Sequence, residues 1–181
     1  TPTALEKHDD LREAAAAAGV EVTYTAEAVI DAMADTVTPQ GVIAVARQFP
    51  TSLRDVFNAS PRLIAICEEV RDPGNLGTII RAADAAGADA VILTGRTVDP
   101  YNPKVVRATT GSLFHVQVAI GGDLDAESSR AQAAGLRVLA ADVKGVDLPE
   151  RRDLLTDPTA WLFGNEARGL TDEALALADE A

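Results

Sequence analysis

The strongest constraint on the fold is a strand–turn–helix pattern at residues 62–87. Residues 63–67 form an apolar run whose length and branching are typical of a buried strand. The densest group of turn residues in the chain follows at 72–75, and apolar residues then recur at helical spacing over 77–87. This order predicts a loop at the carboxyl edge of a sheet, where open α/β sheets bind ligands.

Arg81 occupies an unusual place in this pattern. If the helix begins near Thr78, Arg81 lies in its first turn, next to the loop. A cation there opposes the positive end of the helix dipole, so it does not favour helix stability. The position therefore predicts a role for Arg81 in handling an anion or a substrate.

From Pro61 onward the pattern alternates regularly between strands and helices. Such alternation predicts a mostly parallel sheet with right-handed crossover connections. The expected strands are 62–67, 89–93, 113–118, 136–140 and 160–163, and the expected helices are 77–87, 103–110, 124–134 and one that starts near Thr171.

The first part of the chain predicts a smaller α/β unit. Its expected elements, in order, are a helix at 4–18, a strand at 20–24, a helix at 26–33 capped by Thr25, and a strand at 42–46. Residues 49–60 break the periodicity and are predicted to be a linker with a short helix.

Composition limits the kind of protein. The 181 residues are 47% hydrophobic and carry a net charge of −12, from 16 basic and 28 acidic side chains. This balance argues against a generally basic nucleic-acid-binding surface, so an anion site must be a local group of arginines. No apolar run is long enough to span a membrane, and no signal peptide is evident. Cys67 is the single cysteine, which makes a cytosolic compartment the default expectation and predicts a buried thiol.

Three polar loops are expected at the carboxyl ends of strands: 71–78, 99–112 and 164–170. Each contains a glycine, an asparagine and an arginine, and convergence of such loops is how a doubly wound sheet builds a site. The first loop lacks both the lysine of a P-loop and the full glycine spacing of a dinucleotide site. A nucleotide-binding oxidoreductase is therefore a poor alternative.

Metal and serine-nucleophile chemistry are also disfavoured. His8 and His115 lie far apart without cysteine or carboxylate at metal-ligand spacing, so no metal site is predicted. Ser112 and His115 are close in sequence, but there is no G-x-S-x-G elbow. We expect His115 to be a packed or edge residue of the strand at 113–118.

Three ordered motifs resemble the SpoU/TrmH family of RNA ribose 2′-O-methyltransferases. DPGNLGTIIRAADAAG resembles the first family motif, in which Asn75 and Arg81 match an asparagine and an arginine separated by five residues. DPYNPKVVRATTGSLFHVQV resembles the middle segment, and WLFGNEARGL resembles the second motif. The match departs at Ala167, where glycine is common; this costs little unless the position needs a positive φ.

The resemblance implies an architecture. It implies a parallel-sheet α/β domain of the SPOUT superfamily with a C-terminal trefoil knot over 61–181, S-adenosylmethionine as methyl donor, and a homodimer whose sites combine residues of both subunits. Residues 1–50 resemble the C-terminal part of a small L30e-like RNA-binding α/β domain, and 51–60 are the linker. The family's third motif, which closes the knot, is not found in this sequence, so we expect further sequence after residue 181.

The resemblance also implies site residues. Arg81 matches the catalytic arginine; because a guanidinium is almost never deprotonated, we expect it to bind a phosphate next to the target ribose and to stabilise the developing alkoxide. Asn75 would orient Arg81 or the ribose, and Glu166 would fix its own turn or the neighbouring Asn75 loop. The backbone of Leu162, Phe163 and Gly164, with the strand end at Ala140 and Ala141, would line the cofactor, and Arg107 and Asn102 would contact RNA.

Two functions remain as alternatives to ribosomal RNA methylation. One is a non-catalytic RNA- or ligand-binding protein on the same scaffold, and the other is an enzyme that acts on transfer RNA. The nucleotide that would be modified is not specified by the sequence. Asn75, Arg81, Arg107 and Glu166 could also be plain turn, surface or contact residues.

Overall fold

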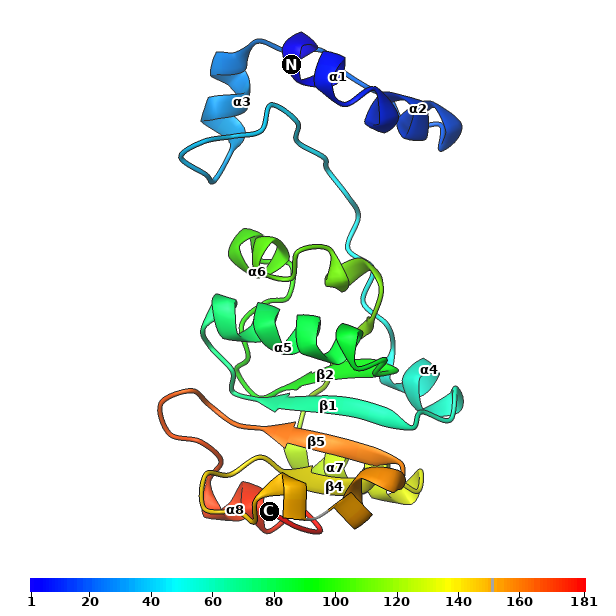
Figure 1. The fold of residues 1–181 in the computed structure, drawn as a ribbon, viewed down its shortest axis with the longest axis vertical. Helices are drawn as coiled ribbons and strands as arrows, with labels where there is room; N and C mark the ends of the chain where they lie inside the picture. The colour runs from blue at the N-terminus through cyan, green and yellow to red at the C-terminus, as the bar shows by residue number, and fades with distance from the viewer. Residues whose placement is uncertain (151) are drawn as a thin grey trace. The chain divides into compact units, whose positions relative to one another are not determined.

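The computed structural model describes residues 1–150 and 152–181 and divides into two compact units, Thr1–Arg47 and Gln48–Ala181. Figure 1 shows the elements of each unit. No helix in the part of the chain that the structure describes is long and apolar enough to cross a membrane.

The second unit is built on a five-stranded sheet in which every neighbouring pair of strands is parallel. The spatial order is β3-β2-β1-β5-β4, so β1 is central. This confirms the parallel sheet that the alternating pattern predicted. The strands are β1 (Leu63–Glu68), β2 (Ala90–Thr94), β3 (Gln117–Ile120), β4 (Arg137–Ala140) and β5 (Thr159–Phe163).

Helices cover both faces of this sheet (Figure 1). Alternate side chains of a strand point to opposite faces. Ala65 and Cys67 of β1 therefore pack with α5 (Pro73–Ala85) and α6 (Pro103–Ala108), whereas Ile64 and Ile66 pack with the helices of the other face. Those helices are α4 (Leu53–Asn58), α7 (Leu124–Ala133) and α8 (Asp172–Leu175). Short 3-10 helices complete the unit at η1 (Ser112–Phe114), η2 (Leu148–Glu150) and η3 (Arg152–Thr156).

Cys67 is the buried thiol that the sequence predicted. Its side chain is fully buried, and burial raises its pKa to about 12 because the thiolate would lose its hydration. The thiol therefore stays protonated and unreactive in the folded sheet.

Helix α5 begins earlier than the sequence pattern indicated. Asp72 is its N-cap, and the Asp72 carboxylate accepts a hydrogen bond from the backbone N–H of Asn75 at 2.9 Å. Pro73 occupies the first helical position, where its missing N–H costs nothing. The residues read as a turn are thus the first turn of the helix. Arg81 lies about two turns further on, so the prediction that it occupies the first turn was wrong.

The first unit contains three helices and no strand among residues 1–47, all of which the structure describes. The predicted helix at 4–18 is interrupted at His8 and becomes α1 (Pro2–Lys7) and α2 (Asp9–Ala17). The third helix is α3 (Glu27–Met33), and its N-cap is Ala26, not Thr25. The strands predicted at 20–24 and 42–46 are absent, because neither segment has a hydrogen-bonded neighbour to complete a sheet.

Candidate active site

The loops that follow β1, β2 and β5 leave the sheet side by side at its carboxyl edge. The register places Cys67 of β1 opposite both Leu93 of β2 and Phe163 of β5. Since all three strands run in the same direction, their loops emerge at one edge. The prediction that loops after three strands meet at one edge of the sheet is therefore confirmed for the segments that directly follow β1, β2 and β5.

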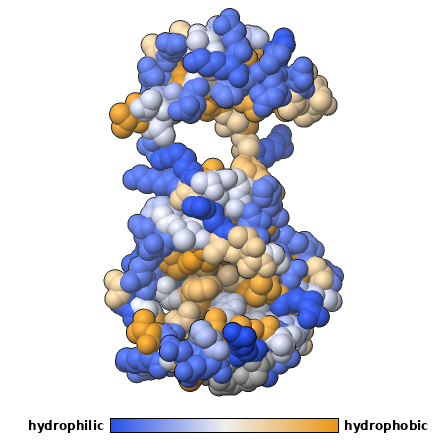
Figure 2. All heavy atoms as spheres, viewed as in Figure 1, coloured by the Kyte–Doolittle hydropathy of each residue, from blue (hydrophilic) through white to orange (hydrophobic). Residues whose placement is uncertain are grey.

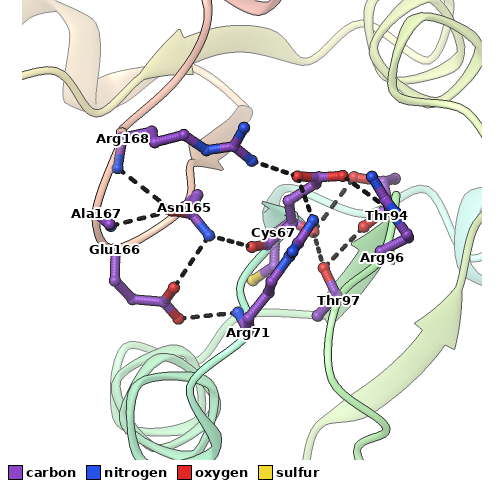
Figure 3. Close-up of polar contacts among 10 residues, drawn as sticks. Cys67, Arg71, Thr94, Arg96, Thr97, Asn165, Glu166, Ala167 and Arg168 are labelled. Carbon is purple, nitrogen blue, oxygen red and sulfur yellow. Dashed lines mark hydrogen bonds and ion pairs between the residues drawn. The ribbon is translucent and has the colours of Figure 1, made fainter.

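Glu166 connects the loop after β5 to the start of α5. One carboxylate oxygen, Oε1, accepts a hydrogen bond from the backbone N–H of Arg71 at 3.0 Å (Figure 3). The same oxygen accepts a second hydrogen bond from the backbone N–H of Asp72 at 2.8 Å. Asn165 adds a second connection, because its side-chain N–H donates to the carbonyl of Glu69 at 2.9 Å. The second motif thus holds the first motif in place through backbone contacts.

Asn165 also shapes its own turn. Its side-chain oxygen accepts hydrogen bonds from the backbone N–H groups of Ala167 at 3.0 Å and Arg168 at 3.3 Å. Gly164 has no room for a side chain, since an added Cβ would lie 2.5 Å from the carbonyl carbon of Gly169. Ala167 does not have a positive φ, so alanine is accommodated where the family commonly has glycine.

Three arginines from three loops converge on Glu69, a group that the sequence did not single out. The Glu69 carboxylate accepts hydrogen bonds from Arg168 at 2.6 Å and Arg71 at 3.0 Å, and Arg96 lies 3.6 Å away (Figure 3). Partial burial disfavours the ionised form, but the nearby guanidiniums outweigh it and lower the pKa of Glu69. No local spacing could have revealed this group, because Arg168 is 99 residues from Glu69.

Asn75 and Arg81 both lie on exposed positions of α5 but not on the same side of it. Six residues along a helix correspond to about 600° of rotation, which leaves the two side chains about 120° apart around the axis. Asn75 is in the first turn, and its backbone N–H is held by Asp72. The structure places Asn75 near the loops and Arg81 further along the helix.

Asn102 and Arg107 lie on α6, which packs closely against α5. An added Cβ at Gly77 would lie 2.4 Å from the Cβ of Ala108, so the two helices are in backbone contact there. Asn102 is the N-cap of α6, and its side-chain oxygen accepts from the N–H of Lys104 at 2.9 Å. Arg107 is exposed in the last turn of α6. Asn102 therefore has a structural task in addition to any contact with RNA.

A cavity of about 450 Å³ lies at the carboxyl end of β4, beside Trp161 in the middle of β5. Ala140 and Ala141 line it together with Trp161 and with the segment 142–148. A neighbouring, strongly apolar hollow of about 400 Å³ is lined by Phe163, Trp161 and the small residues of α5. Figure 2 shows apolar residues gathered around a recess on this face of the second unit.

Among the residues predicted to line a cofactor, Ala140, Ala141 and Phe163 border these cavities, while the side chain of Leu162 is fully buried in the opposite core. Only the backbone of Leu162 is then available to a ligand, as for Gly164, which packs on Gly169.

His115 is not on a strand, contrary to the prediction. It lies in the turn after η1 (Ser112–Phe114), and its exposed ring is 3.1 Å from a carboxylate oxygen of Asp84. Hydrogen bonds from Ser112 and then from His115 lower the pKa of Asp84. Ser112 and His115 are therefore both directed to Asp84, at the far end of α5 from Asn75.

Comparison with known proteins identifies the family. Residues 62–181 match the model of the SpoU rRNA methylase family, and residues 2–52 match the RNA 2′-O ribose methyltransferase substrate-binding model. The chain belongs to the SpoU rRNA methylase family.

Relatives with known activity are about one-third identical. The chain is 34% identical to the 23S rRNA (guanosine(2553)-2′-O)-methyltransferase RlmP of Bacillus subtilis, over 87% of this chain and 60% of that protein. It is 35% identical to a 23S rRNA (uridine(2479)-2′-O)-methyltransferase of Streptomyces viridochromogenes, over 78% of this chain and 50% of that protein. The chain thus spans about half to three-fifths of these relatives.

Solved structures agree with the fold. An AdoMet-bound rRNA methyltransferase from Sinorhizobium meliloti superposes with a TM-score of 0.82 at 35% identity, over 97% of this chain and 67% of that chain. The parallel-sheet α/β architecture of the SPOUT methyltransferases is therefore the fold of this chain.

Proposed function

We propose that this chain is part of an S-adenosylmethionine-dependent enzyme that methylates a ribose 2′-hydroxyl in RNA. The observation that carries the proposal is the connection between the two family motifs: Glu166 accepts two backbone N–H groups from the loop that leads into α5. This contact gives the first motif a fixed position at the carboxyl edge of the sheet. The activities named for relatives at 34–35% identity support the same class of reaction.

The cavity at the carboxyl end of β4 suits the methyl donor. Its volume of about 450 Å³ lies within the usual range for cofactor sites, and its lining combines small residues, Ala140 and Ala141, with the aromatic Trp161. Backbone groups of Phe163 and Gly164 would complete the site. When bound, S-adenosylmethionine supplies an electrophilic methyl group.

The residues of α5 handle the RNA. A 2′-hydroxyl must lose its proton as it attacks, and charge develops on its oxygen. The Arg81 guanidinium stays protonated, so it serves as a cation that binds the neighbouring phosphate and stabilises that charge. Asn75, exposed at the first turn of α5, orients the ribose. Glu166 keeps the loop before α5 in place and does not itself exchange a proton with the substrate.

Ribosomal RNA is the favoured substrate, since the relatives quoted above act on 23S rRNA. Transfer RNA is the second candidate. It is supported by a 28% identical structure, with a TM-score of 0.57, that concerns 2-OH methylation of C/U34 on tRNA. Arg107 and Asn102 on α6 would contact the RNA.

Two further features belong to the proposal. The match of residues 2–52 to a substrate-binding model supports an RNA-binding role for an L30e-like domain over residues 1–50, followed by a linker at 51–60 and the methyltransferase domain from 61, with its trefoil knot. The apolar hollow lined by Trp161 and Phe163 is an exposed surface that assembly as a homodimer would help to cover.

The test is transfer of a labelled methyl group from S-adenosylmethionine to unmodified ribosomal RNA and, in parallel, to transfer RNA. We expect transfer to one RNA, and we expect Arg81→Ala to lower the rate by about 10²–10³-fold, the usual cost of losing a group that stabilises developing charge.

Arg62→Ala is the matched control, because Arg62 is an exposed arginine that precedes β1 at the opposite edge of the sheet. Equal rates for the Arg81→Ala variant and the wild type would disprove the role of Arg81. RNA binding without methyl transfer, together with no heat of S-adenosylmethionine binding by calorimetry, would favour the non-catalytic alternative.

A further inference from the structure

The three arginines around Glu69 are accessible from outside the protein. The exposed fractions of their side chains are 84% for Arg96, 62% for Arg168 and 49% for Arg71. Each approaches the carboxylate with a single nitrogen: Nε for Arg96, and Nη2 for Arg168 and Arg71. A guanidinium carries five N–H donors, so most of the donors of each arginine are not needed for the contact with Glu69.

Stability does not explain why three arginines meet at one carboxylate. An exposed ion pair contributes about 0–1 kcal/mol, and holding several long side chains in one place costs conformational entropy. Two of the three guanidiniums have no carboxylate of their own in this cluster. The arrangement gathers positive charge on a chain whose net charge is −12.

The position of the cluster relates it to the proposed RNA site. Arg71 immediately precedes Asp72, the N-cap of α5, and its backbone N–H is held by Glu166. Arg168 lies in the same loop as Glu166, and Arg96 follows β2, the neighbour of β1. Arg71 and Arg96 therefore come from the loops that lead to α5 and α6, and Arg168 comes from the loop after β5 that contacts the first of these.

The adjacent cavity does not fit an anion. It has a volume of about 500 Å³ and is lined by Arg168 together with the carboxylates of Glu68, Glu69, Asp123, Asp125 and Glu173. These carboxylates repel a phosphate from its interior. An anion is therefore expected on the outer side of the arginines, where Arg71 and Arg96, which do not line the cavity, are exposed.

We propose that Arg96, Arg168 and Arg71 bind the phosphodiester backbone of the RNA beside the target ribose, and that Glu69 is a positioning residue that holds them together. Arginine suits this role because its planar fork matches the geometry of a phosphate. Glu69 follows β1 directly and contacts arginines of the loops after β1, β2 and β5. The inference rests on the proposed function, because RNA is the ligand.

The test measures how the affinity for unmodified large-subunit ribosomal RNA, transcribed in vitro, depends on salt. Each phosphate contact contributes about 0.7–0.9 to the slope of log K against log salt concentration. We expect Arg96→Ala to lower the slope by about one unit, and Arg96→Ala with Arg168→Ala to lower it by about two. Arg96→Lys keeps a charge and should retain most of the slope.

Arg62→Ala is again the control, with the same change of charge at the other edge of the sheet, and it should leave the slope unchanged. Glu69→Gln tests positioning. It leaves all three positive charges in place but removes the negative charge that holds the arginines together. We therefore expect the KM for RNA to rise while thermal stability stays close to that of the wild type. A Glu69→Gln variant with an unchanged KM would remove Glu69 from the proposal.

Two outcomes would overturn the inference in different ways. If the wild type transfers methyl groups but Arg96→Ala and the double variant keep the full salt slope, the proposed function stands and the phosphate contacts are wrong. If the wild type does not bind the RNA at all, both fail. Displacement of RNA by millimolar inorganic phosphate, beyond the effect of matched sodium chloride, would indicate a site for free phosphate and would also overturn the assignment to RNA.

Discussion

The two units use apolar residues differently. In the second unit, branched residues of β1 such as Ile64 and Ile66 are completely buried between parallel neighbours and a layer of helices. In residues 1–47, all of which the structure describes, the buried hydrophobic residues are Ala4 and Ile30. Val45, from a segment with the same apolar pattern as β1, is 94% exposed. An apolar run thus forms a strand only where neighbouring strands and a covering layer exist.

The largest effect should come from truncating the centre of the sheet. Ile66→Ala removes a fully buried side chain from β1, and we expect the free energy of unfolding to fall by about 2–5 kcal/mol. Val45→Ala is the matched variant in the first unit and should change stability by less than about 0.5 kcal/mol. Urea unfolding followed by circular dichroism measures both. Similar losses for the two variants would contradict the contrast between the units.

The next effect concerns the contact between α5 and α6. Gly77→Ala places a Cβ 2.4 Å from the Cβ of Ala108 and 2.9 Å from its carbonyl carbon, so one helix must move. We expect a loss of about 1–3 kcal/mol from overpacking. Gly122→Ala is the control, because an added Cβ there meets no atom within 4 Å. Equal melting temperatures for the Gly77→Ala variant and the wild type would show that the helices are not in close contact.

The sequence predicted the second unit well for a physical reason. Buried parallel strands are short apolar runs bounded by turns, and this pattern is visible locally at 62–67 and 160–163. The same reasoning failed at 20–24 and 42–46, because strand formation depends on partners that a local pattern does not specify. It also misplaced the start of α5: Asp72 and Pro73 resemble a turn, but they equally satisfy the rules for a helix N-terminus.

The candidate site was predictable in part. The motifs pointed to Asn75, Arg81 and Glu166 as residues near the carboxyl edge of the sheet. In the structure, Asp72 connects two of them: its N–H donates to Glu166, and its carboxylate accepts from the N–H of Asn75. Whether these residues have the proposed roles stays a prediction. The arginines around Glu69 could not have been found from spacing, since their contacts join residues up to 99 positions apart.

A smaller effect is expected at the connection between the two motifs. Glu166→Ala removes the acceptor of two backbone N–H groups, which water can replace because Glu166 is exposed, so the loss should be about 1 kcal/mol. Glu166→Gln keeps an acceptor oxygen and should lose less. Hydrogen exchange gives the sharper measurement: the amides of Arg71 and Asp72 should exchange faster in the alanine variant. Unchanged exchange would mean that Glu166 does not hold this loop.

The smallest effect is the pH dependence of the ion pairs around Glu69. These pairs join residues far apart in the sequence, unlike the local Asp9–Arg12 pair of the first unit. Because the folded-state pKa of Glu69 is lowered, its ionised form stabilises the fold above the ordinary glutamate pKa of about 4.3. This contribution is lost as the pH falls through the lower, folded-state pKa. The stability difference between wild type and Glu69→Gln should therefore be constant above about pH 5 and should shrink below it.

Comparison of Glu69→Gln with two other variants decides whether the arginines are the cause. Arg168→Gln removes the nearest guanidinium, at 2.6 Å, so the pKa of Glu69 should rise toward its ordinary value and the pH dependence should weaken. In the first unit, Asp9 pairs with Arg12 one helical turn away, both are exposed, and Asp9→Asn should cost about 0.3–0.5 kcal/mol. If Arg168→Gln left the pH dependence of stability below about pH 5 unchanged, Arg168 would not be a cause of the lowered pKa. The ion pairs of Glu69 would then have no larger effect on stability than the Asp9–Arg12 pair.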